Sequence, residues 1–304
     1  MVDAIYDTKA TTIPVLRYLV AVAEHRHFGR AAAACGVAQP TLSAQLATWE
    51  KRLGIQVFDR DHHGVRVTPA GERVVTAARA ALAALRAVED AAGAAQPPFF
   101  GPLRLGIIPT IAPDLLPWFT RALEREHPDL DLRLREATTA ELRALLDAGA
   151  IDVAVVALLP GMEGHALYRE PFLAALPRGH RLAAEERIDA SALTGERLLL
   201  LDEGHCLRGQ ALDLCGRVQT GGTDVRATSL ATLRRLVGAG LGTTLLPALA
   251  VDPDDRSITC RPLEGAPSRT IGLLWRPGDA RADAYRLLGG LIRKAAPKGQ
   301  VTLC

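Results

Sequence analysis

Apolar residues recur at helical spacing along the first part of the chain. Side chains three and four positions apart predict an amphipathic first helix, and an alanine-rich stretch that stops at Gly36 predicts a short second one. Gln39 and Pro40 then open a longer helix, since proline is tolerated in a first turn. The three expected helices cover residues 13–27, 28–35 and 39–53. The last two, joined by a glycine-containing turn, predict a helix-turn-helix.

The second helix of such a motif enters the major groove of DNA by its N-terminal residues. Hydroxyl and amide side chains there can reach base edges or phosphates. The residues expected to contact DNA are Arg30, on a phosphate, and Pro40, Thr41, Ser43 and Gln45. Leu46 and Trp49 are expected to face inward. A helical hairpin with no nucleic-acid role is the alternative, because short polar side chains are also common helix caps.

A two-stranded wing is predicted over residues 57–68. Arg60 and Arg66 in this stretch are available to the DNA backbone or the minor groove. His62 and His63 stand side by side between the strands. Adjacent histidines are more often a solvated turn than a pair of ligands, so no metal site is expected.

Residues 69–92 predict one long helix with an apolar seam. The seam residues are Val75, Ala78, Leu82 and Leu85. Such a seam favours pairing with a second copy of the chain, which would supply two helix-turn-helix units to a two-half-site operator. Packing within the same chain is the alternative. Residues 93–98, which contain glycine and proline, then break the pattern and form a linker.

Strand-like and helix-like segments alternate from residue 101 onward. This order predicts parallel sheets in two α/β lobes, with a ligand cleft between them. A strand over 270–275 and a helix over 281–294 are expected to return to the first lobe. The expected boundaries are 1–68 for an all-α winged helix-turn-helix domain, 69–98 for the linker helix and hinge, and 99–304 for a two-lobed regulatory domain, with lobe I at about 101–170 and 270–304 and lobe II at about 171–269.

Composition excludes several classes of protein. Hydrophobic residues make up 48% of the 304, charged residues make up 23%, and the net charge is +2, as in an ordinary globular protein. The small positive excess lies within residues 1–100, which hold 11 Lys and Arg against 9 Asp and Glu. No apolar run approaches the roughly 18 residues of a membrane span, and the opening residues show no secretory pattern. A cytoplasmic protein without a membrane partner is therefore expected.

Five cysteines, an odd number, do not suggest a disulfide framework. Cys206 stands out because His205 is beside it and Arg208 is two positions on, and positive charge favours the reactive thiolate. If the segment up to Cys215 is helical, nine steps place the two cysteines on opposite sides, roughly 13 Å apart along the axis. A disulfide needs Cα atoms within about 7 Å, so bonding them would have to remodel the helix. The alternative is two ordinary buried cysteines.

No catalytic signature competes with this interpretation. The sequence has no GxSxG, HExxH or GxxxxGK[ST] motif, so we expect neither an enzyme nor a cofactor. The alternating glycines at 238, 240 and 242 follow an expected helix instead of opening one, which is typical of a helix stop.

Motifs along most of the chain resemble those of the LysR-type transcriptional regulators. The N-terminal motifs are Arg30-Ala31-Ala32, Gln39-Pro40-Thr41-Leu42-Ser43, Phe58-Asp59-Arg60 and Thr68-Pro69-Ala70-Gly71, and the C-terminal pattern ends in Leu246-Pro247. Other stretches are similar to those of the hydrogen-peroxide-sensing members of that family. They include Ile108-Pro109-Thr110, the segment GHCLRGQALDLC at 204–215, and Arg269-Thr270-Ile271-Gly272-Leu273.

The resemblance implies a periplasmic-binding-protein-like regulatory domain that contains a redox switch. Peroxide would oxidise Cys206 to a sulfenic acid, which would condense with Cys215 to a reversible disulfide. The residues that would line the peroxide pocket are Thr110, Thr139, His205 and Arg269. The implied partners are double-stranded promoter DNA, hydrogen peroxide, RNA polymerase and further copies of the chain, as a dimer of dimers. The implied role is activation of antioxidant genes.

Two positions depart from the pattern that the resemblance leads us to expect. Gly209 stands in place of Asp, which lowers the negative charge near Cys206 and loosens the helix by roughly 1 kcal/mol relative to Ala. Ala38 replaces a Ser ahead of Gln39, which removes a helix cap whose loss costs about 1 kcal/mol. The threshold of the switch is therefore expected to differ, while fold and DNA binding are expected to survive.

Three other functions fit parts of the sequence. A LysR-type regulator that responds to a small organic ligand in the interlobe cleft would keep its response when Cys206 is replaced by Ser. A thiol peroxidase would turn over with a reductant, yet it has no need of a helix-turn-helix. A solute-binding protein would share the two lobes, but it would require an export signal, which is not apparent.

Overall fold

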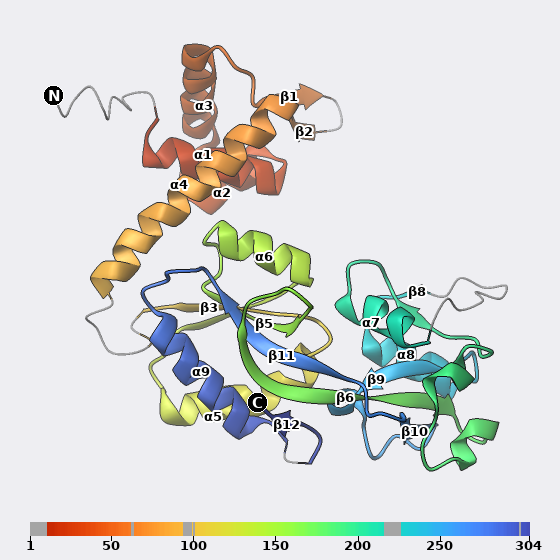
Figure 1. The fold of residues 1–304 in the computed structure, drawn as a ribbon. Coiled ribbons are helices and arrows are strands. Elements are labelled where there is room, and N and C mark those ends of the chain that lie inside the picture. Colours follow the sequence, from red (N-terminus) through yellow and green to blue (C-terminus); the bar gives the residue numbers. More distant parts are fainter. Residues whose placement is uncertain (1–10, 62–63, 94–98, 100, 216–225, 298) are drawn as a thin grey trace. The chain divides into compact units, whose positions relative to one another are not determined.

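The computed structural model describes residues 11–61, 64–93, 99, 101–215, 226–297 and 299–304 (Figure 1). The chain forms two compact units. The first holds residues up to 95 with the short stretch 147–150, and the second holds the remainder. Each unit encloses its own buried hydrophobic cluster, and the second unit encloses two.

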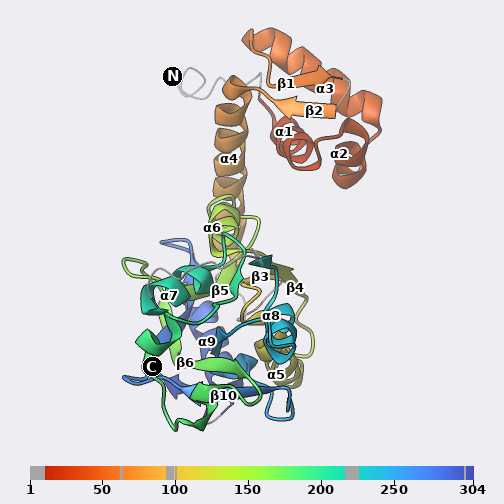
Figure 2. The same ribbon diagram turned by 90° about the vertical axis from the view of Figure 1, so that its right-hand side faces the viewer.

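The first unit contains the predicted helix-turn-helix and wing (Figure 2). Its elements are α1 (Ile13–His25), α2 (Phe28–Cys35), α3 (Gln39–Leu53), β1 (Phe58–Asp61), β2 (Gly64–Val67) and α4 (Pro69–Gly93). Helix α1 ends two residues earlier than predicted, because Arg26 adopts a left-handed conformation with φ of 46°. Leu46 and Trp49 lie in the core as expected. Ala38 occupies the N-cap of α3 and makes no side-chain cap.

The two halves of the apolar seam of α4 differ in burial. Val75 and Ala78 are buried against the core of the first unit, so this half of the seam packs within the chain. Leu82 and Leu85 are only half-buried. The predicted pairing with a second copy therefore concerns the C-terminal half of the helix alone.

The second unit is built on a long mixed sheet in the order β10-β6-β11-β5-β3-β4, with β9 and β12 also paired to β6. The elements of its first part are β3 (Leu103–Ile107), α5 (Ala112–Glu126), β4 (Leu132–Glu136), α6 (Thr139–Asp147), β5 (Val153–Leu158) and β6 (His165–Pro177). The later elements are β7 (Leu200–Leu201), α7 (Cys206–Cys215), β8 (Arg226–Ala227), α8 (Leu230–Gly238), β9 (Thr244–Pro247), β10 (Ile258–Pro262), β11 (Ser268–Trp275), α9 (Ala282–Ala295) and β12 (Thr302–Leu303). Short 3₁₀ helices cover Arg181–Ala184, Ala190–Leu193 and Ala248–Ala250.

The expectation of parallel sheets is wrong for much of this unit. Strand β3 pairs in parallel with β4 and β5, but β6 is antiparallel to β9, β10, β11 and β12. The 13-residue β6 was not predicted, since its residues do not alternate cleanly between apolar and polar. Tyr168 near its start pairs with β11 within one hydrophobic cluster, and Phe172 further on pairs with β9 within the other. One strand therefore crosses both lobes (Figure 1).

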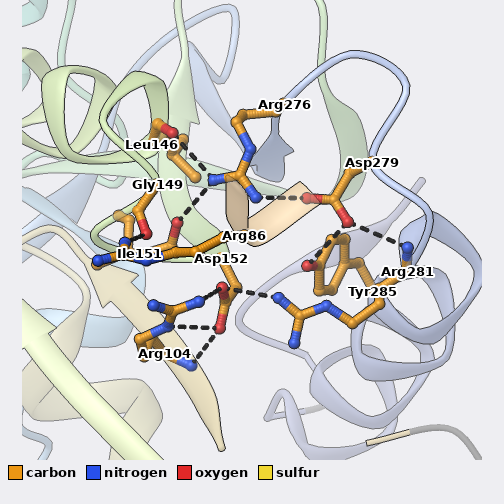
Figure 3. A network of polar contacts seen from close by, with 10 residues as sticks. All are labelled: Arg86, Arg104, Leu146, Gly149, Ile151, Asp152, Arg276, Asp279, Arg281 and Tyr285. Atoms are coloured by element: carbon orange, nitrogen blue, oxygen red, sulfur yellow. Dashed lines mark hydrogen bonds and ion pairs between the residues drawn. The ribbon is translucent and has the colours of Figure 1, made fainter. Parts of the chain in front are cut away.

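A buried ionic network ties the start of the first lobe's strands to α9 (Figure 3). Asp152 is fully buried and accepts hydrogen bonds from the backbone and guanidinium of Arg104, at 2.8 Å and 3.1 Å for Oδ2. Arg281 approaches the other carboxylate oxygen at 2.7 Å. Burial raises the pKa of Asp152, but the opposing effect of Arg104 and Arg281 is larger, so the pKa lies below its ordinary value. The network holds the first lobe together at one edge.

Within the residues that the structure describes, no helix is long and apolar enough to cross a membrane.

Candidate functional site

Helix α7 begins at Cys206 and ends at Cys215, so the segment that joins the two cysteines is helical. Both thiols are free, and Cys215 is buried while Cys206 is half-buried. Nine residue steps along the helix place the two Cα atoms about 13 Å apart along its axis, well beyond the reach of a disulfide. Cys206 packs against the hydrophobic cluster of the first lobe, whereas Cys215 belongs to that of the second. The helix therefore carries one cysteine to each lobe.

The electrostatic surroundings of Cys206 differ from those expected. Burial raises the pKa of its thiol, and the Arg269 guanidinium, the Thr139 hydroxyl and two backbone N–H groups oppose that shift without reversing it. Arg208, which stands two positions after Cys206 and was expected to favour its thiolate, instead donates a hydrogen bond to the Leu201 carbonyl at 3.2 Å. The cation that acts on the thiol thus comes from a distant strand, β11.

Arg269 is buried and held from three sides. Its Nε donates to Glu170 Oε2 at 2.8 Å, and its two terminal nitrogens donate to the hydroxyl and the carbonyl of Thr110, each at 2.9 Å. Arg269 and Glu170 face each other directly across β11 and β6. The other oxygen of Glu170 accepts the Leu249 N–H at 2.9 Å. The arginine is therefore fixed in place before any ligand arrives.

Glu170 is a residue that the sequence reasoning missed. It is fully buried, and no motif marked it. The available signal was a charged residue inside a largely apolar stretch. Such a residue is buried only when its charge is paired, so it indicates a buried ion pair. Because β6 was not predicted, Glu170 could not be placed on a buried strand from the sequence.

A second carboxyl group, that of Asp114, lies close to the Arg269–Glu170 pair. Burial and the Glu170 carboxylate raise the pKa of Asp114 to about 6, against the opposing effect of Arg234 and Arg269. Asp114 lies in the first turn of α5. Arg234, on α8, also forms ion pairs with Asp252 and Asp255 at 3.2 Å and 3.0 Å.

Thr139 is the first residue of α6 and lies beside Cys206. Its side chain is buried, and its Oγ1 makes no hydrogen bond of standard geometry with the described part of the chain. The hydroxyl is nevertheless near enough to lower the pKa of the Cys206 thiol. The structure thus brings Thr110, Thr139 and Arg269 to one neighbourhood with Cys206, and His205 directly precedes it.

An open groove of about 660 Å³ runs along α7, and we call it the α7 groove. Residues from α6, from the connection between β5 and β6, and from α7 line it. The lining residues are Thr139, Ala140, Arg143, Leu159, Pro160, Met162, Glu203, Gly204, His205, Cys206, Arg208, Gly209, Gln210, Leu212 and Asp213. Cys206 therefore lies in the wall of a cavity as well as against the core.

The residues expected to contact DNA lie on the first unit. Pro40, Thr41 and Gln45 at the start of α3 are exposed, and Ser43 is half-buried. The exposed Arg30 donates a hydrogen bond to the His25 carbonyl at 3.0 Å. His27 caps α2 by accepting the backbone N–H of Gly29 at 3.0 Å. Arg60 lies on β1, where the structure does not describe its side chain.

The two histidines of the wing, His62 and His63, lie outside the described residues. Among the residues that are described, no group of three or more His, Cys, Asp or Glu side chains could hold a metal ion.

A winged helix-turn-helix joined to a two-lobed α/β domain is the architecture of a ligand-responsive transcriptional regulator. Residues 14–72 match the bacterial regulatory helix-turn-helix model of the lysR family, and residues 96–297 match the LysR substrate binding domain. The chain therefore belongs to the LysR family of transcriptional regulators, and within that family it closely resembles OxyR.

The similarity to OxyR extends over most of the chain. The DNA-binding transcriptional dual regulator OxyR of Escherichia coli is 42% identical over 285 residues, covering 91% of this chain and 93% of that protein. The probable hydrogen peroxide-inducible genes activator of Mycobacterium avium is 43% identical over 293 residues, covering 94% of each.

Solved structures of OxyR proteins share the fold. A full-length OxyR variant from Pseudomonas aeruginosa matches with a TM-score of 0.76 at 37% identity, covering 93% of this chain and 95% of that one. A Corynebacterium glutamicum OxyR mutant with hydrogen peroxide bound matches with a TM-score of 0.62 at 37% identity, covering 93% and 92%.

Proposed function

We propose that the protein is a transcriptional regulator that senses hydrogen peroxide through Cys206 and a reversible Cys206–Cys215 disulfide, and that it activates antioxidant genes. The observation that carries the proposal is the arrangement around α7. A buried Arg269 and a Thr139 hydroxyl act on the Cys206 thiol at the start of the helix, and Cys215 stands at its far end. The names of the relatives, as hydrogen peroxide-inducible activators, support the same conclusion.

The first chemical step oxidises one sulfur. The Cys206 thiolate attacks one oxygen of the peroxide, the O–O bond breaks, and the second oxygen leaves as hydroxide and takes a proton to become water. The sulfur is left as a sulfenic acid. The positive charge of Arg269 stabilises the thiolate and the departing oxygen, and a fixed charge in a buried site does so without reorganisation.

The second step closes the switch. The Cys215 thiol attacks the sulfenic sulfur, water leaves, and a disulfide forms. Because the helical separation of about 13 Å exceeds disulfide reach, α7 has to unwind for this bond to form. A chemical change at one sulfur thereby becomes a change in the packing of both lobes, since each cysteine belongs to a different hydrophobic cluster.

The output of the switch is altered binding to double-stranded promoter DNA, in the cytoplasm. The exposed N-terminal residues of α3, with Arg30 and Arg60, would form the contacting surface. The half-exposed part of the α4 seam supports pairing with a second copy. A dimer of dimers would then place paired helix-turn-helix units on the promoter next to RNA polymerase.

Disulfide mapping by mass spectrometry after a near-stoichiometric peroxide pulse tests the proposal, with promoter footprinting of the same samples. The expected result is a Cys206–Cys215 bond that forms in seconds and shifts the footprint. Cys206→Ser abolishes both changes, while Cys260→Ser, at a half-buried thiol on β10, leaves them intact. A footprint that does not respond to oxidation would favour the rival regulator, whose effector is a small organic ligand in the cleft.

A further inference from the structure

Helices α5 and α9 of the second unit pack side by side and leave a groove toward their C-terminal ends, which we call the α5–α9 groove (Figure 1). Its volume is about 440 Å³, within the range of pockets that accept small organic molecules. The aromatic and charged residues in its wall are Trp118, Arg121, Arg125, Glu126 and Lys294. The proposed peroxide chemistry uses none of them.

Trp118 presents its indole ring to the groove without covering from the rest of the unit. The residue is 52% exposed. It forms no hydrogen bond, ring contact or cation–π contact with another residue that the structure describes. Because tryptophan is the largest apolar side chain and stacks readily on other rings, a flat ligand would cover this surface favourably.

Three cations surround the ring. Arg121 and Arg125 follow Trp118 on the same face of α5, since positions three and seven residues apart lie above one another on a helix. Lys294 approaches from α9. None of the three forms an ion pair or a side-chain hydrogen bond within the described part of the chain. One carboxylate, that of Glu126, shares the wall, so the groove carries a net charge of +2.

Helix ends explain only part of this arrangement. Arg125 and Lys294 lie in the last turns of α5 and α9, where a positive charge interacts favourably with the helix dipole. Arg121 lies before the last turn, and the dipole gives no reason for an exposed tryptophan beside it. A ligand that has both a flat ring and negative charge accounts for the tryptophan and for all three cations.

We propose that the α5–α9 groove binds an aromatic anion with two or more negative charges, the chemistry of a nucleoside diphosphate. The ring stacks on Trp118, and the anionic groups lie between Arg121, Arg125 and Lys294. A guanidinium suits this role because its parallel N–H donors match two oxygens of one phosphate. The site shares no lining residue with the α7 groove, so it goes beyond the proposed sensing of peroxide.

Equilibrium dialysis of the full, reduced chain at low ionic strength tests the proposal with three probes. ADP carries both the ring and the charge, adenosine carries the ring alone, and inorganic pyrophosphate carries the charge alone. ADP is expected to bind at one saturable site per chain, at least about tenfold more tightly than either other probe, because stacking and ion pairing both contribute. Added salt should weaken ADP binding, since it screens exposed charges.

Variants remove the two parts of the site separately. Trp118→Ala should weaken ADP binding about tenfold, the scale of one base stacked on an aromatic side chain, and leave pyrophosphate binding unchanged. Arg121→Gln combined with Arg125→Gln should weaken both probes at least about tenfold. The controls are Leu287→Ala, at a similarly exposed apolar residue of α9, and Arg178→Gln, at an exposed arginine without an ion pair among the described residues. All five positions are exposed, so the hydrophobic clusters stay intact.

Several results would overturn the proposal. Pyrophosphate that binds as tightly as ADP would show that the ring contributes nothing, and adenosine that binds as tightly would show the same for the charge. ADP binding that survives the Trp118 and arginine substitutions, or that falls equally in the two controls, would place the ligand elsewhere. The absence of saturable ADP binding would also overturn it. None of these results bears on the oxidation of Cys206, which disulfide mapping tests.

Discussion

At the scale of single residues, Cys206, the proposed peroxide-reactive cysteine, lies in a shielded position. Burial raises the pKa of its thiol, and Arg269 only partly offsets that effect. The thiolate is the reacting form, so its population and the oxidation rate should increase as the pH rises. We expect the rate to keep increasing above about pH 8.5, where an ordinary cysteine is half ionised. Stopped-flow oxidation of wild type across pH checks this, and a plateau already reached at neutral pH would contradict it.

Glu170 is the residue on which the placement of Arg269 depends. Removing one partner of a buried ion pair leaves an uncompensated charge, which costs about 3 kcal/mol or more. Glu170→Gln should therefore lower the free energy of unfolding by about that amount, because Arg269 is almost fully buried. Arg169→Gln is the matched control, since Arg169 is adjacent in sequence but exposed. Urea denaturation compares the two, and equal small losses would show that the pair contributes little.

At the scale of elements, the proposed mechanism makes the stability of α7 decide how readily the Cys206–Cys215 disulfide forms. Gly209 weakens the helix, and Gly209→Ala should stabilise it by about 1 kcal/mol without a steric clash. The substitution then stabilises the reduced form relative to the disulfide form, so the reduction potential of the cysteine pair should rise by about 20 mV. Thiol-disulfide equilibration with glutathione measures the shift.

The control for this helix effect is Gly195→Ala, at an exposed glycine outside any helix where an added Cβ also meets nothing within 4 Å. It should leave the potential unchanged. The same shift in both variants, or none in Gly209→Ala, would mean that α7 does not unwind during disulfide formation.

At the scale of the whole regulatory unit, β6 should make the two lobes unfold together. The strand pairs with β11 in one lobe and with β9 and β10 in the other, so neither lobe can open without losing part of it. Asp152→Asn removes the buried charge between Arg104 and Arg281 in the first lobe, at a cost of about 3 kcal/mol.

That loss is expected to appear in the second lobe as well. Hydrogen exchange in β5 and thiol labelling of the buried Cys215 should both become faster. The free energy of opening derived from each rate should fall by the same amount. Unchanged protection of Cys215 would show that the lobes unfold independently.

Local patterns determined much of this protein. The apolar periodicity and the glycine at position 36 specified α2 and α3 to the residue, because helix formation and helix ends depend on neighbours a few positions away. The interval between Cys206 and Cys215 specified that a helix there would hold the two thiols apart, and the structure contains that helix. Thr110, Thr139 and Arg269 were identified as site residues only through resemblance to a family, since no local rule connects positions so distant in sequence.

Tertiary structure decided the remainder. The path of β6, its antiparallel partners and the contact between Glu170 and Arg269 depend on strand register, which links residues far apart along the chain. A strand that is buried along most of its length leaves no clean alternation of apolar and polar residues. The identity of the cation acting on Cys206 was decided in the same way. Arg208 is near in sequence but bonds to the backbone, whereas Arg269 is brought close by the sheet. Sequence thus specified the two cysteines proposed to react, and the long-range pairing of strands determined which charge acts on Cys206.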